Sequence, residues 1–344
     1  MHCMKETTNR TDIKLLDCTL RDGGHVNDAD FGIDVIKNIT DGLAKSGIDF
    51  VELGFLKNGN FSLHQSSYND VSEIYPTLPE HYSCNFSVMI RPDWYDINQL
   101  SDCDGRISTI RFAFYNRDFD LLQRYCNIVS SKGYRVICNP VNVMGYNSEE
   151  LTVLAKKLNA LHPEQVTIVD TYGSMNIPDL HRIYTIIEDN LDEDIRIGIH
   201  LHENMSLAYG LAQEFLRIKN LDRKAMIDGS LLGMGRMPGN LCIEIIASHF
   251  NDNYDTDYNT DIIYDLIGKY IEPIKKVIPW GYSPAYYITA LLNMHRSYAE
   301  YLLKKQDISM SDINAILKSI DVSERRLFNE KYIENLYDKY KKRG

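Results

Sequence analysis

The sequence has 344 residues, which is enough for one large domain and a smaller one. Its hydrophobic share of 44% and charged share of 25% are those of a globular protein, and its net charge of -11 argues against a general nucleic-acid binder. No apolar run approaches the roughly 20 residues that cross a bilayer, which argues against a membrane-spanning protein.

Short apolar runs recur along the first two thirds of the chain. Runs this short and continuously apolar predict strands that are buried on both faces, as in a parallel sheet. Eight such runs lie at residues 13–18, 50–55, 86–90, 109–114, 135–139, 165–169, 196–199 and 225–232.

Amphipathic stretches of helical periodicity, such as residues 35–44 and 151–158, separate these runs. Some end at a glycine, with Gly47 and Gly133 as expected helix stops. Eight β–α units over about 240 residues predict a TIM (β/α)8 barrel. A doubly wound sheet would need a glycine-rich dinucleotide turn after its first strand, and the turn here is Arg-Asp-Gly-Gly-His (residues 21–25).

The last quarter of the chain has a different pattern. Residues 251–257 are polar and rich in helix breakers, which predicts a linker. From about residue 262 onward the apolar spacing is helical. We therefore predict a TIM-barrel catalytic domain over residues 1–255 and a small all-helical domain over residues 256–344.

Polar side chains follow nearly every predicted strand, at the end where a TIM barrel places its chemistry. His200 and His202 lie two residues apart on a strand, so their side chains point to the same side and can bind one ion. Asp22 follows the first strand, which neighbours the seventh once the barrel closes through the eighth. Two hydrogen-bonded histidines on a polar face are the simpler alternative, but the nearby carboxylate favours a metal site.

Two imidazoles and one carboxylate leave positions open for oxygen ligands, which indicates a catalytic ion. The absence of thiolate ligands makes Mn²⁺ our first expectation, with Mg²⁺, Co²⁺ or Zn²⁺ as alternatives.

Three further residues bear on the chemistry. Arg21 precedes Asp22 and can stabilise an oxyanion, although an ion pair across the barrel mouth is the alternative. His25 is a candidate acid/base, unless it is a simple surface residue. Lys57 is the only lysine near a predicted strand end, so the sequence gives little support to a Schiff-base aldolase.

Three segments, LDCTLRDGG (16–24), GIHLHENMSLAYG (198–210) and GMGRMPGN (233–240), together resemble the signatures of the metallolyases named for their DRE motif. This HMGL-like group contains HMG-CoA lyase and isopropylmalate synthase. The resemblance implies a TIM barrel in which Asp22, His200 and His202 hold a divalent ion and Arg21 stabilises an enolate. It also implies that Asn240 supplies a further metal ligand.

Within the group, the Arg-Asp-Gly-x-His pattern is similar to that of the 4-hydroxy-2-oxovalerate aldolases, which implies that His25 is the acid/base. Gly-Tyr-Ser at residues 281–283 resembles their pattern in which a tyrosine enters the site, which points to Tyr282. The glycine-rich loop departs from the family: it carries Arg236, Met237 and Pro238, and it lacks the cysteine of HMG-CoA lyases. Arg236 either binds an anionic group on a different substrate or pairs with an acid on the rim.

The resemblance implies a metal-dependent aldehyde-lyase of the class II type. It would cleave or form a 4-hydroxy-2-oxo acid through a pyruvate enolate, with a 2-oxo acid and an aldehyde as its small-molecule partners. One alternative is a Claisen-type acyl-CoA lyase or synthase of the same family. Less favoured alternatives are a metal-dependent hydrolase, in which the His-x-His pair commonly lies on the first strand, and a metal-binding partner without catalytic activity.

Partners and location follow from weaker patterns. The seven cysteines are scattered without a CxxC pair, which favours reduced thiols and a cytoplasmic location. We expect a homo-oligomer, a dimer in the first instance. The helical segment from residue 262 could dock an aldehyde-consuming dehydrogenase, as in the related aldolases, although its Tyr- and Leu-rich stripes favour a lid or a dimer interface.

Overall fold

The computed structural model describes residues 13–342. Within them, eight parallel strands pair in the order β1-β9-β8-β7-β6-β5-β4-β2, and a pairing of β1 with β2 closes the barrel. The two-residue strand β3 (Ser67–Tyr68) adds to β2. The barrel strands are β1 (Ile13–Asp17), β2 (Phe50–Leu56), β4 (Asn85–Ile90), β5 (Thr109–Phe114), β6 (Arg135–Pro140), β7 (Gln165–Val169), β8 (Arg196–His200) and β9 (Ala225–Gly229).

The predicted TIM barrel is therefore confirmed, with the predicted strands within one to three residues of those found. The last one differs most, because β9 ends at Gly229. Its predicted extension to residue 232 instead turns into the 3-10 helix η7 (Leu231–Gly233), where Leu232 has a φ of 53°. The predicted helix stops also hold: α1 (Ile33–Lys45) and α2 (Phe119–Ser131) end two residues before Gly47 and Gly133, whose φ angles are 84° and 90°.

Helices cover the outside of the barrel, but two connections lack an α-helix. The segment between β2 and β4 forms the 3-10 helix η3 (Val71–Thr77), and that between β4 and β5 only η4 (Ile97–Gln99). Prolines in these segments, Pro76 and Pro79 in the first and Pro92 in the second, remove donors that an α-helix needs. The remaining covering helices are α3 (Ser148–Leu161), α4 (Ile177–Glu188), α5 (Ala208–Ile218) and α6 (Ile243–Asn253).

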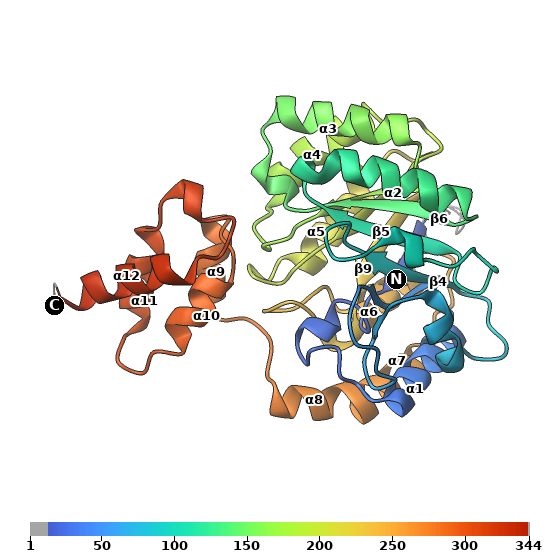
Figure 1. The fold of residues 1–344 in the computed structure, drawn as a ribbon, viewed down its shortest axis with the longest axis horizontal. Helices are drawn as coiled ribbons and strands as arrows, with labels where there is room; N and C mark the ends of the chain where they lie inside the picture. The colour runs from blue at the N-terminus through green and yellow to red at the C-terminus, as the bar shows by residue number, and fades with distance from the viewer. Residues whose placement is uncertain (1–12, 343–344) are drawn as a thin grey trace, which may run out of the picture.

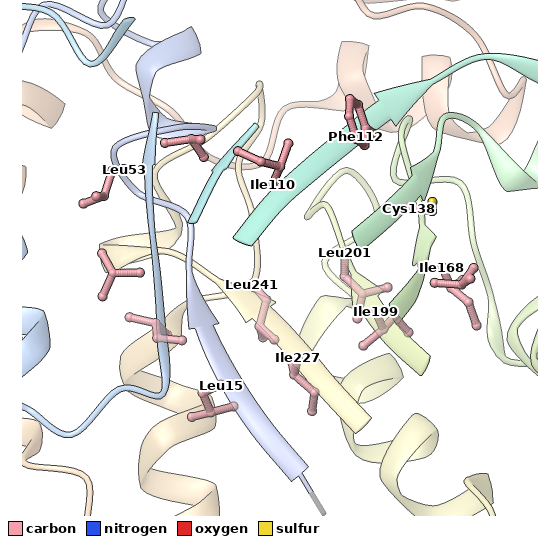
Figure 2. Packing of buried hydrophobic residues seen from close by; sticks show 14 of the residues in the cluster. Leu15, Leu53, Ile110, Phe112, Cys138, Ile168, Ile199, Leu201, Ile227 and Leu241 are labelled. Carbon is pink, nitrogen blue, oxygen red and sulfur yellow. The ribbon is translucent and has the colours of Figure 1, made fainter. Parts of the chain in front are cut away.

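Alternation along the strands divides the barrel residues into two sets. One set is apolar and packs against the helices; Figure 2 shows Leu15, Ile227 and Ile199 from three neighbouring strands in this layer. The other set points into the barrel and includes buried Glu52 and Arg111. The strands are therefore buried on both faces, as predicted, but the inner face is partly charged.

The C-terminal helices fall into two groups. α7 (Thr260–Leu266), the π-helical turn η8 (Ile267–Ile271) and α8 (Glu272–Val277) pack on the barrel, and their buried side chains belong to its core. A separate core joins the later helices, and the two cores divide near residues 280–285. The domain boundary at 255/256 stays a prediction. These later helices are α9 (Pro284–Leu291), α10 (Ser297–Leu303), α11 (Met310–Lys318) and α12 (Glu330–Lys341).

We call residues 284–341 the C-terminal unit; Figure 1 shows it in orange and red beside the barrel. It contacts the loops at the carboxyl ends of the strands. Tyr172, after β7, donates its hydroxyl to the carbonyl oxygen of Arg326 at 2.8 Å, and Arg326 donates to the carbonyl oxygen of Gly145 at 2.7 Å. The unit therefore borders the end of the barrel where the predicted site lies. No helix of residues 13–342 is long and apolar enough to cross a membrane.

Candidate metal centre

The structure brings together the three predicted metal ligands. His200 is the last residue of β8, His202 follows two residues later, and Asp22 follows β1. Because β1 and β8 both pair with β9, their carboxyl ends are close. One donor atom from each side chain lies within 4.8 Å of the other two, and all three residues are buried. This is the spacing that a single small cation requires.

Hydrogen bonds fix the histidine tautomers in a form suited to a cation. The Nδ1 of His202 lies 2.9 Å from the carbonyl oxygen of Asp170, which can only accept, so Nδ1 carries the proton. Its Nε2 is buried, has no hydrogen-bond partner in the part of the chain that the structure describes, and lies 3.7 Å from Asp22 Oδ2. In the same way, Nδ1 of His200 lies 3.2 Å from a carboxylate oxygen of Asp228. In each imidazole Nδ1 is engaged in this way, which leaves Nε2 as the nitrogen available to a metal ion, as in metal-binding histidines.

Asp22 is held as an anion. Burial opposes its ionisation, but the adjacent Arg21 guanidinium and His202 hold the pKa of Asp22 well below its usual range. Its Oδ1 accepts from Arg21, and its Oδ2 accepts the backbone N–H of Arg236 at 3.0 Å. Two neutral imidazole nitrogens and one carboxylate therefore fit a divalent ion of the Mn²⁺ or Zn²⁺ type.

Asn240 lies beside this cluster but does not line the cavity above it. A backbone bridge joins Asn240 to His202, and the side-chain Nδ2 donates to the carbonyl oxygen of Met234 at 3.2 Å. The Oδ1 of Asn240 is buried and none of the described residues hydrogen-bonds to it, which fits an additional oxygen ligand. Gly235 permits this approach: a Cβ there would lie 2.2 Å from Asn240 Nδ2 and 2.7 Å from Asp22 Oδ2. The role of Asn240 stays a prediction.

A buried network of charges lies beneath the three ligands. Glu52 Oε2 accepts from Arg21 Nε at 2.7 Å and from Arg111 Nη1 at 3.0 Å. Arg111 also donates to Asp228, which in turn bonds His200. Both ends of the network therefore reach the candidate metal ligands, and it fixes Arg21 and His200 in orientation.

Sequence reasoning missed Arg111 and Asp228, because both lie inside runs read as apolar strands. The available signal was the charge itself: a charged residue in a strand that is buried on both faces needs a partner. Both positions alternate with the outward apolar residues, which places their side chains inside the barrel.

A cavity of about 330 Å³ opens above the ligands. His25 lines it, with one third of its side chain exposed and its ring 5.7 Å from that of Phe55. Its Nε2 lies 4.0 Å from Asp22 Oδ1. Burial, together with the charges of Arg236 and Arg21, lowers the pKa of His25 to about 4. The imidazole is therefore neutral near pH 7 and has the form of a general base.

Tyr282 does not lie in this cavity. Its side chain is 59% exposed on the outer surface, with its ring 6.4 Å from that of Tyr287. The expectation that Tyr282 enters the site therefore differs from the structure, because the segment before α9 runs along the surface. The C-terminal unit reaches the cavity through His295 and Arg296 instead. Local periodicity gave no signal for these two residues, because their position depends on how the two cores meet.

Comparison with known proteins agrees with this architecture. The chain matches the HMGL-like family over residues 115–267. It is 24% identical over 307 residues to a 4-hydroxy-2-oxovalerate aldolase of Marinomonas sp., covering 86% of this chain and 89% of that protein. A second relative with the same name, from Pseudoalteromonas translucida, is 23% identical over 311 residues and covers 86% of this chain and 88% of its own length.

Among solved structures, the fold is similar to the N-terminal domain of a candidate aldolase from Bacteroides vulgatus. The TM-score is 0.75 at 19% identity, and the match covers 89% of this chain and all of that domain. The barrel, the position of the buried Asp-His-His cluster and these matches agree, and the chain is similar to the HMGL-like family over residues 115–267.

Proposed function

We propose that the protein is a divalent-metal-dependent aldolase that cleaves or forms a 4-hydroxy-2-oxo acid through the enolate of pyruvate. The observation that carries this proposal is the buried set of Asp22, His200 and His202 beside Arg21, at the catalytic end of a TIM barrel. The names of the two relatives support the same reaction, although identities of 23–24% leave the substrate a proposal.

A divalent ion at this set would act as a Lewis acid toward the carboxylate and keto oxygens of a 2-oxo acid. Arg21 has the position to stabilise the enolate oxygen. Its described hydrogen bonds engage Nε with Glu52 and Nη1 with Asp22, which leaves Nη2 for a substrate oxygen in the cavity. Both partners hold the guanidinium in place before substrate binds, so little reorganisation is needed.

His25 supplies the acid/base function in this proposal. In the cleavage direction it accepts the proton of the C4 hydroxyl while the C3–C4 bond breaks, and the electron pair of that bond becomes the enolate. His25 is suited to this role because its imidazole faces the cavity on the same side as Arg21 and Asp22. Tyr282 takes no part, because its side chain lies on the outer surface.

The main alternative is Claisen-type chemistry on an acyl-CoA, since the same enolate stabilisation would serve it. The glycine-rich loop at residues 233–240 has no cysteine, whereas the corresponding loop of the HMG-CoA lyases contains one. We therefore rank the aldolase first, and the test below includes the acyl-CoA reaction.

The test measures pyruvate release from 4-hydroxy-2-oxopentanoate by purified protein loaded with Mn²⁺. Chelation should remove the activity and Mn²⁺ should restore it. Arg21→Ala should keep its metal but lose about 10²- to 10³-fold in turnover, because an oxyanion stabiliser is lost. His200→Ala should lose both metal and turnover.

Two results would contradict the proposal. One is full aldolase activity in protein shown by elemental analysis to contain no metal. The other is release of CoA thiol from acetyl-CoA and a 2-oxo acid by protein that does not cleave any 4-hydroxy-2-oxo acid, which would assign the Claisen alternative.

A further inference from the structure

Five arginine side chains line the cavity, and they differ in how their charges are neutralised. Three of them donate hydrogen bonds to carboxylates: Arg21 to Glu52 and Asp22, Arg111 to Glu52 and Asp228, and Arg91 to Asp93 at 2.6 Å. The remaining two are Arg236, from the glycine-rich loop, and Arg296, from the C-terminal unit. Arg296 has Glu300 within ion-pair distance, and among the described residues Arg236 has no carboxylate that close.

Arg236 has no carboxylate within 4.0 Å of its guanidinium among residues 13–342. Its Nη2 donates to Nε2 of His295 at 2.9 Å, and its guanidinium carbon lies 5.9 Å from the centre of the Tyr172 ring. Burial and the charges of Arg236 and Arg296 lower the pKa of His295 to about 3. His295 is therefore neutral, and it orients Arg236 without compensating its charge.

Arg296 is only partly compensated. Its Nε lies 3.2 Å from Glu300 Oε1, within ion-pair distance but without hydrogen-bond geometry. Both Nε and Nη1 are buried and have no hydrogen-bond partner among residues 13–342, and 18% of the side chain is exposed. Burial and the repulsion of Arg236 lower the pKa of Arg296. The guanidinium groups of Arg236 and Arg296 repel each other and have N–H donors to spare. An anion bound between them would relieve the repulsion and accept hydrogen bonds from these donors.

The position of the pair relative to the metal ligands indicates which anion this is. The backbone N–H of Arg236 bonds Asp22, so the pair borders the same cavity as the ligand set. In the proposed aldolase reaction the carboxylate of the 2-oxo acid already faces the metal and Arg21. The anion at Arg236 and Arg296 must then belong to the other substrate.

We propose that the aldehyde substrate carries an anionic group, a carboxylate or a phosphate, and that Arg236 and Arg296 bind it. This inference rests on the proposed aldolase function. In the cleavage direction the C4 hydroxyl loses its proton, the C3–C4 bond breaks with its electron pair remaining on C3, and C4 departs as an aldehyde that still bears the anion. The reaction needs no oxidant or reductant.

The experiment compares a charged aldehyde with a neutral aldehyde of similar carbon skeleton in the addition of pyruvate by the Mn²⁺-loaded protein. The pairs are glyoxylate with acetaldehyde, succinic semialdehyde with pentanal, and glyceraldehyde 3-phosphate with glyceraldehyde. We expect kcat/KM to be higher for the charged member by about 10- to 100-fold, the range that charge-assisted hydrogen bonds give. The first two pairs identify a carboxylate and the third a phosphate.

Variants assign the preference to the two arginines. Arg236→Met and Arg296→Met should each remove most of the preference for the charged aldehyde and change kcat/KM for its neutral counterpart less than about threefold. Arg236→Lys should restore part of it, because the charge remains while the planar pair of donors is lost. Arg117→Met is the matched control: Arg117 lies on the same rim, 59% exposed and outside the cavity lining, so the preference should persist.

A reaction without aldehyde separates the two proposals. Exchange of the pyruvate methyl protons in D₂O, followed by NMR, reports enolate formation alone and should be unaffected by Arg236→Met. If exchange occurs but charged aldehydes hold no advantage, the anion proposal is wrong and the aldolase proposal survives. An increased KM for pyruvate in Arg236→Met, with unchanged aldehyde preference, also overturns it. Absence of exchange in the wild-type protein would contradict the proposed function itself.

Discussion

Arg111 and Asp228 form an ion pair in the centre of the barrel, with both side chains entirely buried. They lie 117 residues apart in the sequence, on β5 and β9. Asp228 also accepts a hydrogen bond from Nδ1 of His200 at 3.2 Å. The pair therefore connects the interior of the barrel to the orientation of a candidate metal ligand.

Asp228→Asn should weaken metal binding without removing a ligand. The substitution loses the negative charge that fixes the His200 tautomer, and such outer partners typically change metal affinity by about 10- to 100-fold. Titration with Mn²⁺, with the free ion measured by its EPR signal, gives the Kd directly. An unchanged Kd in a variant with a native circular dichroism spectrum would show that Asp228 does not tune the site.

Arg111→Met should reduce stability rather than only activity. Removing the guanidinium leaves Glu52 and Asp228 as buried carboxylates without their main partner, and breaking a buried pair in this way costs about 3–5 kcal/mol. The free energy of unfolding in urea is the measurement. A loss below 1 kcal/mol would mean that the remaining network rearranges to satisfy both carboxylates.

Gly235→Ala should disturb the metal centre through its new methyl group. That group would lie 2.2 Å from Asn240 Nδ2 and 2.7 Å from Asp22 Oδ2, so one of the two side chains must move. We expect the affinity for Mn²⁺ to fall at least tenfold, because displacing a metal ligand or the side chain that supports it typically has an effect of this size.

Gly210→Ala is the matched control for this change. Gly210 lies in α5, and a Cβ there meets nothing within 4 Å. It should leave Mn²⁺ affinity unchanged and stabilise the helix by up to about 1 kcal/mol. Equal Mn²⁺ affinities in the two variants would argue against the tight packing at Gly235.

The stability of the protein should depend on pH through Asp17. Burial raises the pKa of Asp17 to about 7 in the folded protein, although two hydrogen bonds from Thr19 oppose the shift. Because the folded pKa lies above the unfolded value, the stabilisation is fully present below the unfolded pKa and is lost as the pH rises toward 7. Between pH 5 and pH 8 the loss is about 2–3 kcal/mol.

Asp17→Asn should remove this dependence, because the amide stays neutral and still offers an oxygen to the Thr19 N–H. Urea unfolding of both proteins at pH 5 and pH 8 makes the comparison. The difference in unfolding free energy between variant and wild type should grow with pH in favour of the variant. Parallel pH dependence in the two proteins would mean that Asp17 titrates normally.

The barrel and the clustering of Asp22, His200 and His202 were predictable because each depends on local sequence. A run of five or six apolar residues predicts a barrel strand, and the polar residues after it predict the end of the barrel that carries the site. Two histidines two residues apart point to the same side wherever a strand ends. Even the helix stops were local, since Gly47 and Gly133 adopt backbone angles that other residues avoid.

The remaining features depend on contacts between distant segments. Arg111 meets Asp228 only when β5 and β9 face each other across the closed barrel. His295 and Arg296 reach the cavity, while Tyr282 does not, because of how a second core is seated against the first. No periodicity in residues 256–344 carries that information, which is why His295 and Arg296 could not be predicted to line the cavity.

The division of the molecule into two hydrophobic cores has a consequence for how its specificity can change. The candidate metal ligands and Arg21 belong to the barrel, whereas Arg296 is built on a separately packed unit of fewer than 60 residues. Recombination or drift within that unit can alter the far wall of the cavity while leaving the ionic network of the barrel intact. Related chains would then share the same catalytic residues in the barrel and differ in substrate specificity.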